Sequence, residues 1–117
     1  MPNPYLEWID ENQEMRRLEI VDRVFIGRIC RGIDETRRII IEHPSVSRDH
    51  AEINISGPRP KIRVLSKNGT WVNSVRLAAG STKELVDGDL VSLGETLFHL
   101  RFPNPPSFNT NEKLEST

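Results

Sequence analysis

The stretch that decides the fold is SRDHAEINI, residues 47–55. Its first four residues are polar and favour a loop, whereas Ala51, Ile53 and Ile55 then place an apolar side chain at every second position. A period of two is typical of a half-buried strand, because successive side chains of a strand point to opposite faces. The stretch therefore predicts a polar loop that leads directly into a strand.

The same alternation recurs on both sides of this stretch. Its apolar positions are Leu18 and Ile20, Val24 and Ile26, Ile62 and Val64, Val91 and Leu93, and Phe98, Leu100 and Phe102. Turn residues such as His43-Pro44 and Asp87-Gly88 separate these runs at intervals of about ten residues, which leaves no room for a helix of normal length. Roughly nine to eleven short strands with regular turns predict an all-β fold, an antiparallel β-sandwich.

The length and composition fit one domain. The chain has 117 residues, of which 36% are hydrophobic and 28% are charged, and a chain of this size buries about two thirds of its unfolded surface. From Pro103 onward the sequence has three prolines and few apolar residues, so this segment is not expected to form a packed element. We expect one domain over residues 1–103 and a disordered tail or linker over residues 104–117, as in one module of a larger protein.

Membrane, secreted and metal-held scaffolds are not expected. No apolar run approaches the roughly 20 residues of a membrane helix, and residues 1–8 lack the basic start and apolar centre of a secretory signal. Cys30 is the only cysteine, so neither an internal disulfide nor a cysteine-based zinc site can form. We expect an intracellular protein without a metal, a cofactor or a membrane partner.

The charges are segregated along the chain although the formal net charge is only −1. Residues 28–76 hold ten Lys or Arg and five Asp or Glu, a net charge of +5 for the segment. Such a basic segment can focus a field that attracts anions. Single-stranded nucleic acid would also require exposed aromatic side chains between the basic ones, and Trp71 is the only aromatic residue between Phe25 and Phe98. We therefore expect an anionic partner other than a nucleic acid.

Three short motifs supply groups suited to an anion. Gly27 allows the backbone to approach closely, and Arg28 next to it is a bidentate donor suited to phosphate. Ser47 offers a hydroxyl beside the cationic Arg48. The sequence KNGT at residues 67–70 predicts a turn with positive φ that leaves backbone N–H groups and an amide side chain free.

Ser47 and His50 also have a spacing that would allow a nucleophile and a base to touch. A catalytic serine needs a base within hydrogen-bond reach and a third group that orients this base. The sequence implies neither the third group nor an oxyanion hole, so we do not expect an enzyme.

Taken in order, four blocks form a specific combination: GR at 27–28, SRDHAEI at 47–53, NGTWVN at 68–73 and LVDGDLVSLG at 85–94. This combination closely resembles the forkhead-associated (FHA) domain. The resemblance implies an eleven-stranded antiparallel β-sandwich of the forkhead-associated type, whose loops at one end bind phosphothreonine in an extended peptide. The strands predicted from the alternation agree with this fold.

The resemblance also implies roles for individual residues. Arg28 would contact the phosphate, Ser47 would donate its hydroxyl to it, and Asn68 would hold the peptide backbone beside the phosphothreonine. Arg48 and Lys67 stand at positions that resemble additional phosphate or backbone contacts. Asn73 stands where the family contacts the peptide main chain.

Other residues of the four blocks resemble structural positions of the family. Gly27, His50 and Gly69 would support the binding loops, and the histidine would do so through a hydrogen bond. Trp71 is interpreted as a core residue. Ser74 replaces a glycine that the family often has after the second asparagine of its block, which would alter the neighbouring loop.

The leading hypothesis is thus a non-catalytic module that binds a phosphothreonine-containing protein or peptide and recruits its host protein to kinase-modified partners. The alternative is a phosphate-independent interaction or self-association scaffold on the same fold. Under the alternative, replacing Arg28 by Ala would leave partner binding intact.

Overall fold

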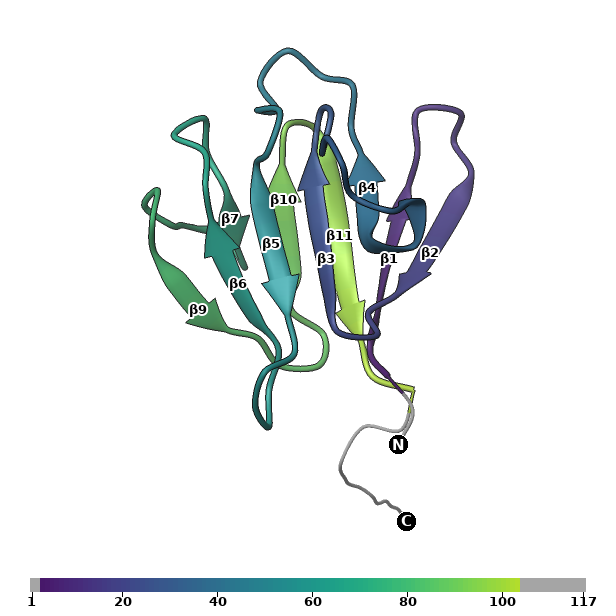
Figure 1. Ribbon diagram of the computed structural model, residues 1–117, viewed down its shortest axis with the longest axis vertical. Coiled ribbons are helices and arrows are strands. Elements are labelled where there is room, and N and C mark those ends of the chain that lie inside the picture. Colours follow the sequence, from purple (N-terminus) through teal and green to yellow (C-terminus); the bar gives the residue numbers. More distant parts are fainter. Residues whose placement is uncertain (1–2, 104–117) are drawn as a thin grey trace.

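Eleven strands form two β-sheets that lie face to face in the computed structural model, which describes residues 3–103 (Figure 1). The strands of the first sheet are β1 Tyr5–Ile9, β2 Met15–Glu19, β7 Trp71–Val72, β8 Val75–Arg76, β10 Leu90–Leu93 and β11 Thr96–Arg101. The strands of the second sheet are β3 Arg23–Gly27, β4 Arg38–Ile40, β5 Ala51–Asn54, β6 Lys61–Val64 and β9 Thr82–Glu84. Their spatial orders are β2-β1-β11-β10-β7-β8 and β4-β3-β5-β6-β9. The predicted β-sandwich is confirmed.

One pair of neighbours departs from the antiparallel expectation. Strands β3 and β4 run parallel, with Phe25 opposite Arg38 and Gly27 opposite Ile40. A parallel pair needs a connection that returns the chain to the starting end of the sheet. Residues 28–37 make this return, and they include the 3₁₀ turn η1 Glu35–Arg37.

The core follows the alternation seen in the sequence. Val24 and Ile26 of β3, Ile53 of β5 and Ile62 of β6 face inward and are fully buried. Side chains of the other sheet meet them from β1, β7, β10 and β11, namely Leu6, Val72, Val91, Leu93, Phe98 and Leu100. Burial of these two apolar faces is the main stabilising contribution to the sandwich.

Several loops lie at one end of the sandwich, at the top of Figure 1. They include the β3–β4 loop (28–37), the β4–β5 loop (41–50), the β6–β7 loop (65–70), the β10–β11 turn (94–95) and the β1–β2 turn (10–14). Strand β1 begins and strand β11 ends at the opposite end (Figure 1). The loops predicted to bind a ligand therefore lie away from the segments that enter and leave the domain.

Within residues 3–103, no helix is long and apolar enough to cross a membrane. The tail expected over residues 104–117 lies outside the described residues.

Candidate functional site

The β3–β4 and β4–β5 loops are joined through their backbones. The amide N–H of Arg28 donates to the carbonyl of Ser47 at 2.8 Å, and those of Ile29 and Cys30 donate to the carbonyl of Arg48 at 3.2 and 3.1 Å. A Cβ at Gly27 would lie 2.2 Å from this Arg48 oxygen. Gly27 is thus the residue whose lack of a side chain lets the two loops meet.

This junction also orients the side chain of Arg28. Its Nε donates to the carbonyl of Val46 at 3.1 Å, so the guanidinium is attached to the β4–β5 loop. The residue is exposed. Among the described residues, the terminal nitrogens of the guanidinium have no hydrogen-bond partner, so they are available to an anion.

A chain of hydroxyl and amide groups joins the β4–β5 loop to the β6–β7 loop. Ser47 Oγ lies 2.5 Å from Ser66 Oγ, and Asn68 Nδ2 donates to Ser47 Oγ at 3.2 Å. Ser66 Oγ also accepts the backbone N–H of Asn68 at 2.9 Å. When Ser66 donates to Ser47, the proton of the Ser47 hydroxyl remains available to an incoming acceptor.

Ser66 is the residue of this cluster that the sequence analysis missed. It is 5% exposed and holds both predicted site residues, Ser47 and Asn68. Its spacing from Asn68 is the signal that was present, because a serine hydroxyl often caps the backbone two residues further on. Its approach to Ser47 has no signal in the sequence.

The side chain of His50 also joins the β4–β5 loop to the β6–β7 loop. Its Nδ1 accepts the backbone N–H of Ser47 at 3.1 Å, so Nε2 carries the proton and donates to the carbonyl of Gly69 at 2.9 Å. The side chain is fully buried, and this burial lowers the pKa of the imidazole from its ordinary value. A neutral His50 thus bonds two loops that are 19 residues apart.

The same contacts remove the geometry that a Ser-His catalytic pair would need. The imidazole bonds the backbone N–H of Ser47, whereas the Ser47 hydroxyl lies against Ser66 and Asn68. Burial raises the pKa of the Cys30 thiol to about 11, so the protonated form of this residue is favoured. Within residues 3–103, no three His, Cys, Asp or Glu side chains are grouped so that they could hold a metal ion.

Trp71 shapes the β6–β7 loop, and its interpretation as a core residue is wrong. Its neighbour Val72 faces the core, so Trp71 lies on the outer face of the sheet and is half-buried. A Cβ at Gly69 would lie 2.6 Å from the indole, and Gly69 has a φ of +104°. The guanidinium of Arg76 lies 5.8 Å from the centre of the ring system, and Arg76 Nη2 donates to the carbonyl of Lys67 at 3.1 Å. Arg76 is therefore a second residue of this loop cluster that the sequence analysis did not single out.

The remaining predicted site residues differ in whether their side chains are exposed or already hydrogen-bonded within the domain. Arg48 and Lys67 are exposed on the loops that carry Ser47 and Asn68. Asn73 instead bonds within the domain, because its Nδ2 donates to Asp89 Oδ1 at 2.9 Å and its Oδ1 accepts the N–H of Leu90 at 3.0 Å. The structure thus places Arg28, Ser47 and Asn68 on joined loops. The side-chain amide of Asn73 is instead engaged in hydrogen bonds within the domain.

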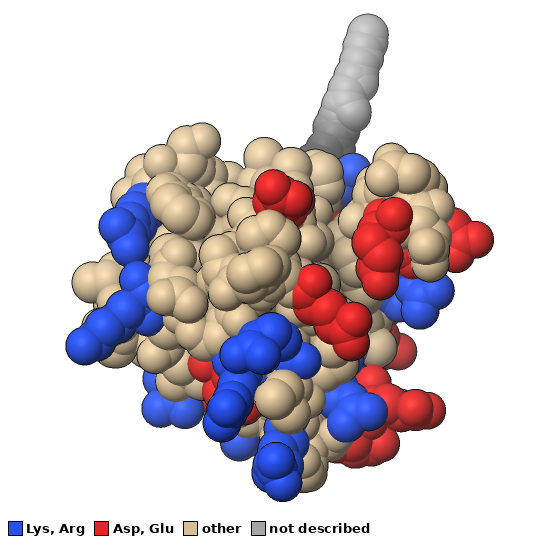
Figure 2. Space-filling model, turned by 90° about the horizontal axis from the view of Figure 1, so that it is seen from above, with Lys and Arg blue, Asp and Glu red and all other residues tan. Residues whose placement is uncertain are grey.

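Charge is unevenly distributed over this end of the molecule. The exposed basic residues of the loops are Arg28, Arg31, Arg48 and Lys67, with Arg76 at the edge. Figure 2, which looks onto this end, shows Lys and Arg gathered over its left and lower parts and Asp and Glu mainly over its right half. The donors of the candidate site thus lie in a locally positive field.

Comparisons with known proteins agree on one family. The sequence pattern of the FHA domain matches residues 24–94. The FHA domain-containing protein PS1 of Arabidopsis thaliana is 37% identical over 59 residues, which are 48% of this chain and 4% of that protein. The chain therefore spans a small part of the length of that relative.

Solved structures extend the similarity over most of the chain. The FHA domain of an Arabidopsis thaliana hypothetical protein superposes with a TM-score of 0.72 at 29% identity, over 92% of this chain and 91% of that one. An FHA domain solved in a study of phosphothreonine-dependent FHA domain interactions superposes with a TM-score of 0.65 at 28% identity, over 87% of this chain and 98% of that one.

Proposed function

This chain belongs to the FHA domain family, and from that premise we propose that it is a phosphothreonine-dependent peptide-binding module that recruits its host protein to kinase-modified partners. FHA domains are interaction modules, so the proposal assigns no catalytic step to the chain. The study of phosphothreonine-dependent interactions that produced one of the similar structures supports this reading.

The observation that carries the proposal is the gathering of unlike donors from three loops. Arg28 offers free guanidinium N–H groups, Ser47 offers a hydroxyl, and Asn68 offers an amide 3.2 Å from that hydroxyl. A phosphothreonine carries about −1.5 to −2 charges and three acceptor oxygens. We assign the phosphate to Arg28 and Ser47, and the peptide backbone beside it to Asn68.

Arg48 and Lys67 extend this site as exposed cations on the same loops. Asn73 is left out of the proposed contacts because both ends of its amide are bonded to Asp89 and Leu90. Gly27, His50 and Gly69 support the loops through the contacts described above.

The expected affinity follows from the strength of these bonds. Each charge-assisted hydrogen bond contributes roughly 1.5–3 kcal/mol, so three contribute about 4.5–9 kcal/mol. Ordering a flexible peptide offsets part of this gain, and we expect micromolar binding, about −8 kcal/mol.

Fluorescence anisotropy with a degenerate phosphothreonine peptide pool tests the proposal. The comparison pools are unphosphorylated and phosphoserine peptides, and the variants are Arg28→Ala and, as a matched control, Arg59→Ala in the exposed β5–β6 turn. We expect saturable binding of the phosphothreonine pool, weakened roughly 10- to 100-fold by Arg28→Ala and unchanged by Arg59→Ala. Equal binding of all pools by wild type and Arg28→Ala would instead support a phosphate-independent scaffold.

A further inference from the structure

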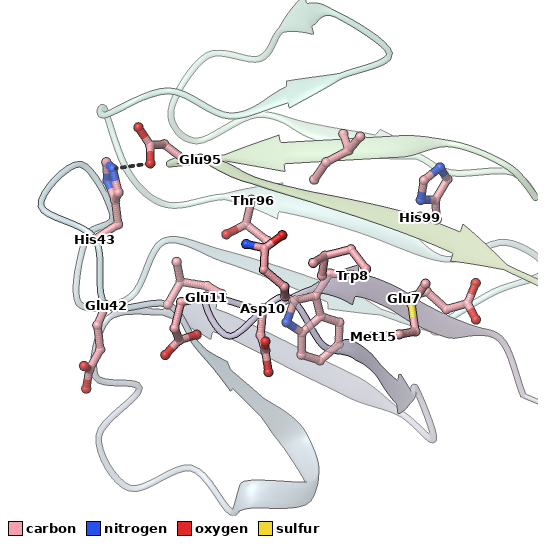
Figure 3. A pocket seen from close by; sticks show the side chains of 14 residues that line it. Glu7, Trp8, Asp10, Glu11, Met15, Glu42, His43, Glu95, Thr96 and His99 are labelled. Atoms are coloured by element: carbon pink, nitrogen blue, oxygen red, sulfur yellow. Dashed lines mark ion pairs between the residues drawn. The ribbon is translucent and has the colours of Figure 1, made fainter.

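A groove of about 680 Å³ lies between the β1–β2 hairpin and the β4–β5 loop. Its walls come from β1, the hairpin turn, residues 41–43 and the start of β11 (Figure 3). It is separate from the hydroxyl cluster of Ser47, Ser66 and Asn68, none of which lines it.

Exposed apolar side chains line this groove together with Trp8, which packs against the core. Ile9, Met15 and Leu97 are 48%, 62% and 46% exposed, and Trp8 lies beside them with its ring 5.3 Å from that of Phe98. Exposed apolar side chains that are grouped and rimmed by polar residues mark surfaces that bind a partner. The groove can therefore take an apolar side chain.

The polar residues around the groove are mainly acidic. Its acidic lining residues are Glu7, Asp10, Glu11, Glu42 and Glu95. Figure 3 shows the carboxylates of Asp10, Glu11 and Glu42 following one another along one side of the groove, near Trp8. Within residues 3–103, Glu11 and Glu42 form no salt bridge, and no Lys or Arg lines the groove. Glu7, Asp10 and Glu95 each lie within 4 Å of a basic side chain, so the uncompensated negative charge of the groove is that of Glu11 and Glu42.

A second hollow lies beside Arg28 of the proposed phosphate site. It has a volume of about 460 Å³ and is lined by Arg28, Ile29, Glu42, His43 and Pro44. Glu42 and His43 also line the larger groove, so the two hollows share these two residues. An extended peptide held at Arg28 would reach the groove by passing Glu42 and His43.

We propose that this groove binds the segment that flanks the phosphothreonine in the same partner, and that the segment carries a Lys or Arg together with an apolar side chain. The proposal rests on the proposed function, because the phosphate anchors the segment. The negative charges of Glu11 and Glu42 favour a basic segment in the groove. They repel an acidic flank and attract a basic one. On the other side of the phosphate, Arg48, Lys67 and Arg76 favour an acidic flank.

A lysine scan of one phosphothreonine peptide with neutral flanks tests the inference. Lysine is placed in turn at six positions on each side, and the affinity gain is the Kd of the neutral peptide divided by that of the lysine peptide. The proteins are wild type, Glu42→Gln, Arg28→Ala and, as a control with the same change of charge, Glu84→Gln on exposed β9.

We expect lysine to raise the affinity about two- to fivefold on one side of the phosphothreonine only, as an exposed ion pair does. The gain should persist in Glu84→Gln, vanish in Glu42→Gln and shrink with added salt. A leucine scan on that side should show a gain that Leu97→Ser removes.

A flat lysine scan, a gain that Glu42→Gln leaves intact, or a gain from aspartate at the same positions overturns the inference alone, provided that the neutral phosphopeptide binds and Arg28→Ala weakens this binding at least tenfold. If no phosphopeptide binds wild type, the proposed function fails and the inference fails with it. Equal binding of unphosphorylated lysine peptides would also overturn it, because the groove would then act without the phosphate.

Discussion

Gly27 illustrates how a residue without a side chain can be required by a binding site. Its Cα faces the carbonyl of Arg48, which accepts two amide hydrogen bonds from the β3–β4 loop. A methyl group there would lie 2.2 Å from a backbone oxygen that cannot rotate away. One of the two loops would have to move, and both carry groups of the proposed site.

Gly27→Ala is therefore expected to lower the free energy of unfolding by about 1–3 kcal/mol and to weaken phosphopeptide binding at least tenfold. The matched control is Gly57→Ala, because a Cβ at Gly57 meets nothing within 4 Å. Urea denaturation and peptide anisotropy measure the two effects. Unchanged peptide affinity in a folded Gly27→Ala variant would show that the loop junction does not position the site.

His50 predicts a pH dependence of stability. Its folded pKa is lowered below the ordinary 6.5 by burial, so the unfolded chain takes up a proton near pH 6.5 before the folded chain does. Stability is therefore fully present above pH 6.5 and is lost as pH falls below it, at up to about 1.4 kcal/mol per pH unit.

Urea midpoints at pH 7.5 and 5.5 check this dependence in wild type and His50→Gln. The variant should be less stable at pH 7.5, since Ser47 and Gly69 lose their partner, and it should lose less stability on acidification. His43 and His99 are present in both proteins, so their contributions cancel in the comparison. An equal pH slope in both would contradict the role given to burial of His50.

The residues of the site that could be predicted are those whose chemistry is visible in a single turn. Arg28, Ser47 and Asn68 fall in this group, and the structure places them on joined loops. Ser66 could not be predicted in the same way, because its partner Ser47 is 19 residues away. The interpretation of Trp71 failed because a large aromatic residue beside a buried valine does not reveal which of the two faces the core.

At the scale of the strand, periodicity predicted β3, β5, β6, β10 and β11, each of which buries one face, but the alternation did not include β1, which buries Leu6. Strands β8 and β9 have only exposed residues, so no apolar alternation marks them. Strand β4 has an apolar run, and nothing local in that run shows that it pairs parallel to β3. Edge strands are held by their neighbours, and their own sequence therefore carries less information.

The outer face of β5 shows how a central strand is held on its polar side. Glu52 is 4% exposed, and its carboxylate lies 3.1 Å from Arg63 of β6 and 3.4 Å from Arg23 of β3. The side chains of Arg63 and Arg23 are 51% and 54% exposed, so the buried carboxylate is paired with two guanidinium groups that also reach water. One carboxylate thus ties three neighbouring strands.

Glu52→Ala should lower the free energy of unfolding by about 1–2 kcal/mol, because it removes both ion pairs and leaves two arginines close together. Glu84→Ala, at an exposed position of β9, should change it by less than about 0.5 kcal/mol. Urea midpoints compare the two, and phosphopeptide affinity should stay within twofold in both. Equal midpoints for the two variants would show that the cross-strand network contributes nothing.

At the scale of the whole molecule, the described chain enters and leaves at the end opposite the loops (Figure 1). Tyr5 of β1 is paired directly with Arg101 of β11, so a short linker can connect these two strands. The exposed β5–β6 turn around Gly57 lies at the same lower end. New chain ends placed there would not interrupt any contact of the proposed site.

A circular permutant that joins β11 to β1 and opens at Gly57 should fold and bind phosphopeptide within about threefold of wild type. A permutant opened between Lys67 and Asn68 should fold less stably and lose binding, because Asn68 is bonded to Ser66 and Ser47. Anisotropy and thermal melts distinguish the two. Equal binding by both would place the site away from the β6–β7 loop.

The pairing of β1 with β11 also determines how the domain responds to tension. The two strands are antiparallel neighbours, with Tyr5 opposite Arg101 and Glu7 opposite His99, and their hydrogen bonds lie across the strand direction. A force that pulls Tyr5 and Arg101 apart loads these bonds one after another, as in opening a zipper, rather than all together in shear. The domain would therefore begin to unfold at low force, starting at the end farthest from its loops. The force would reach a partner held at Arg28 last.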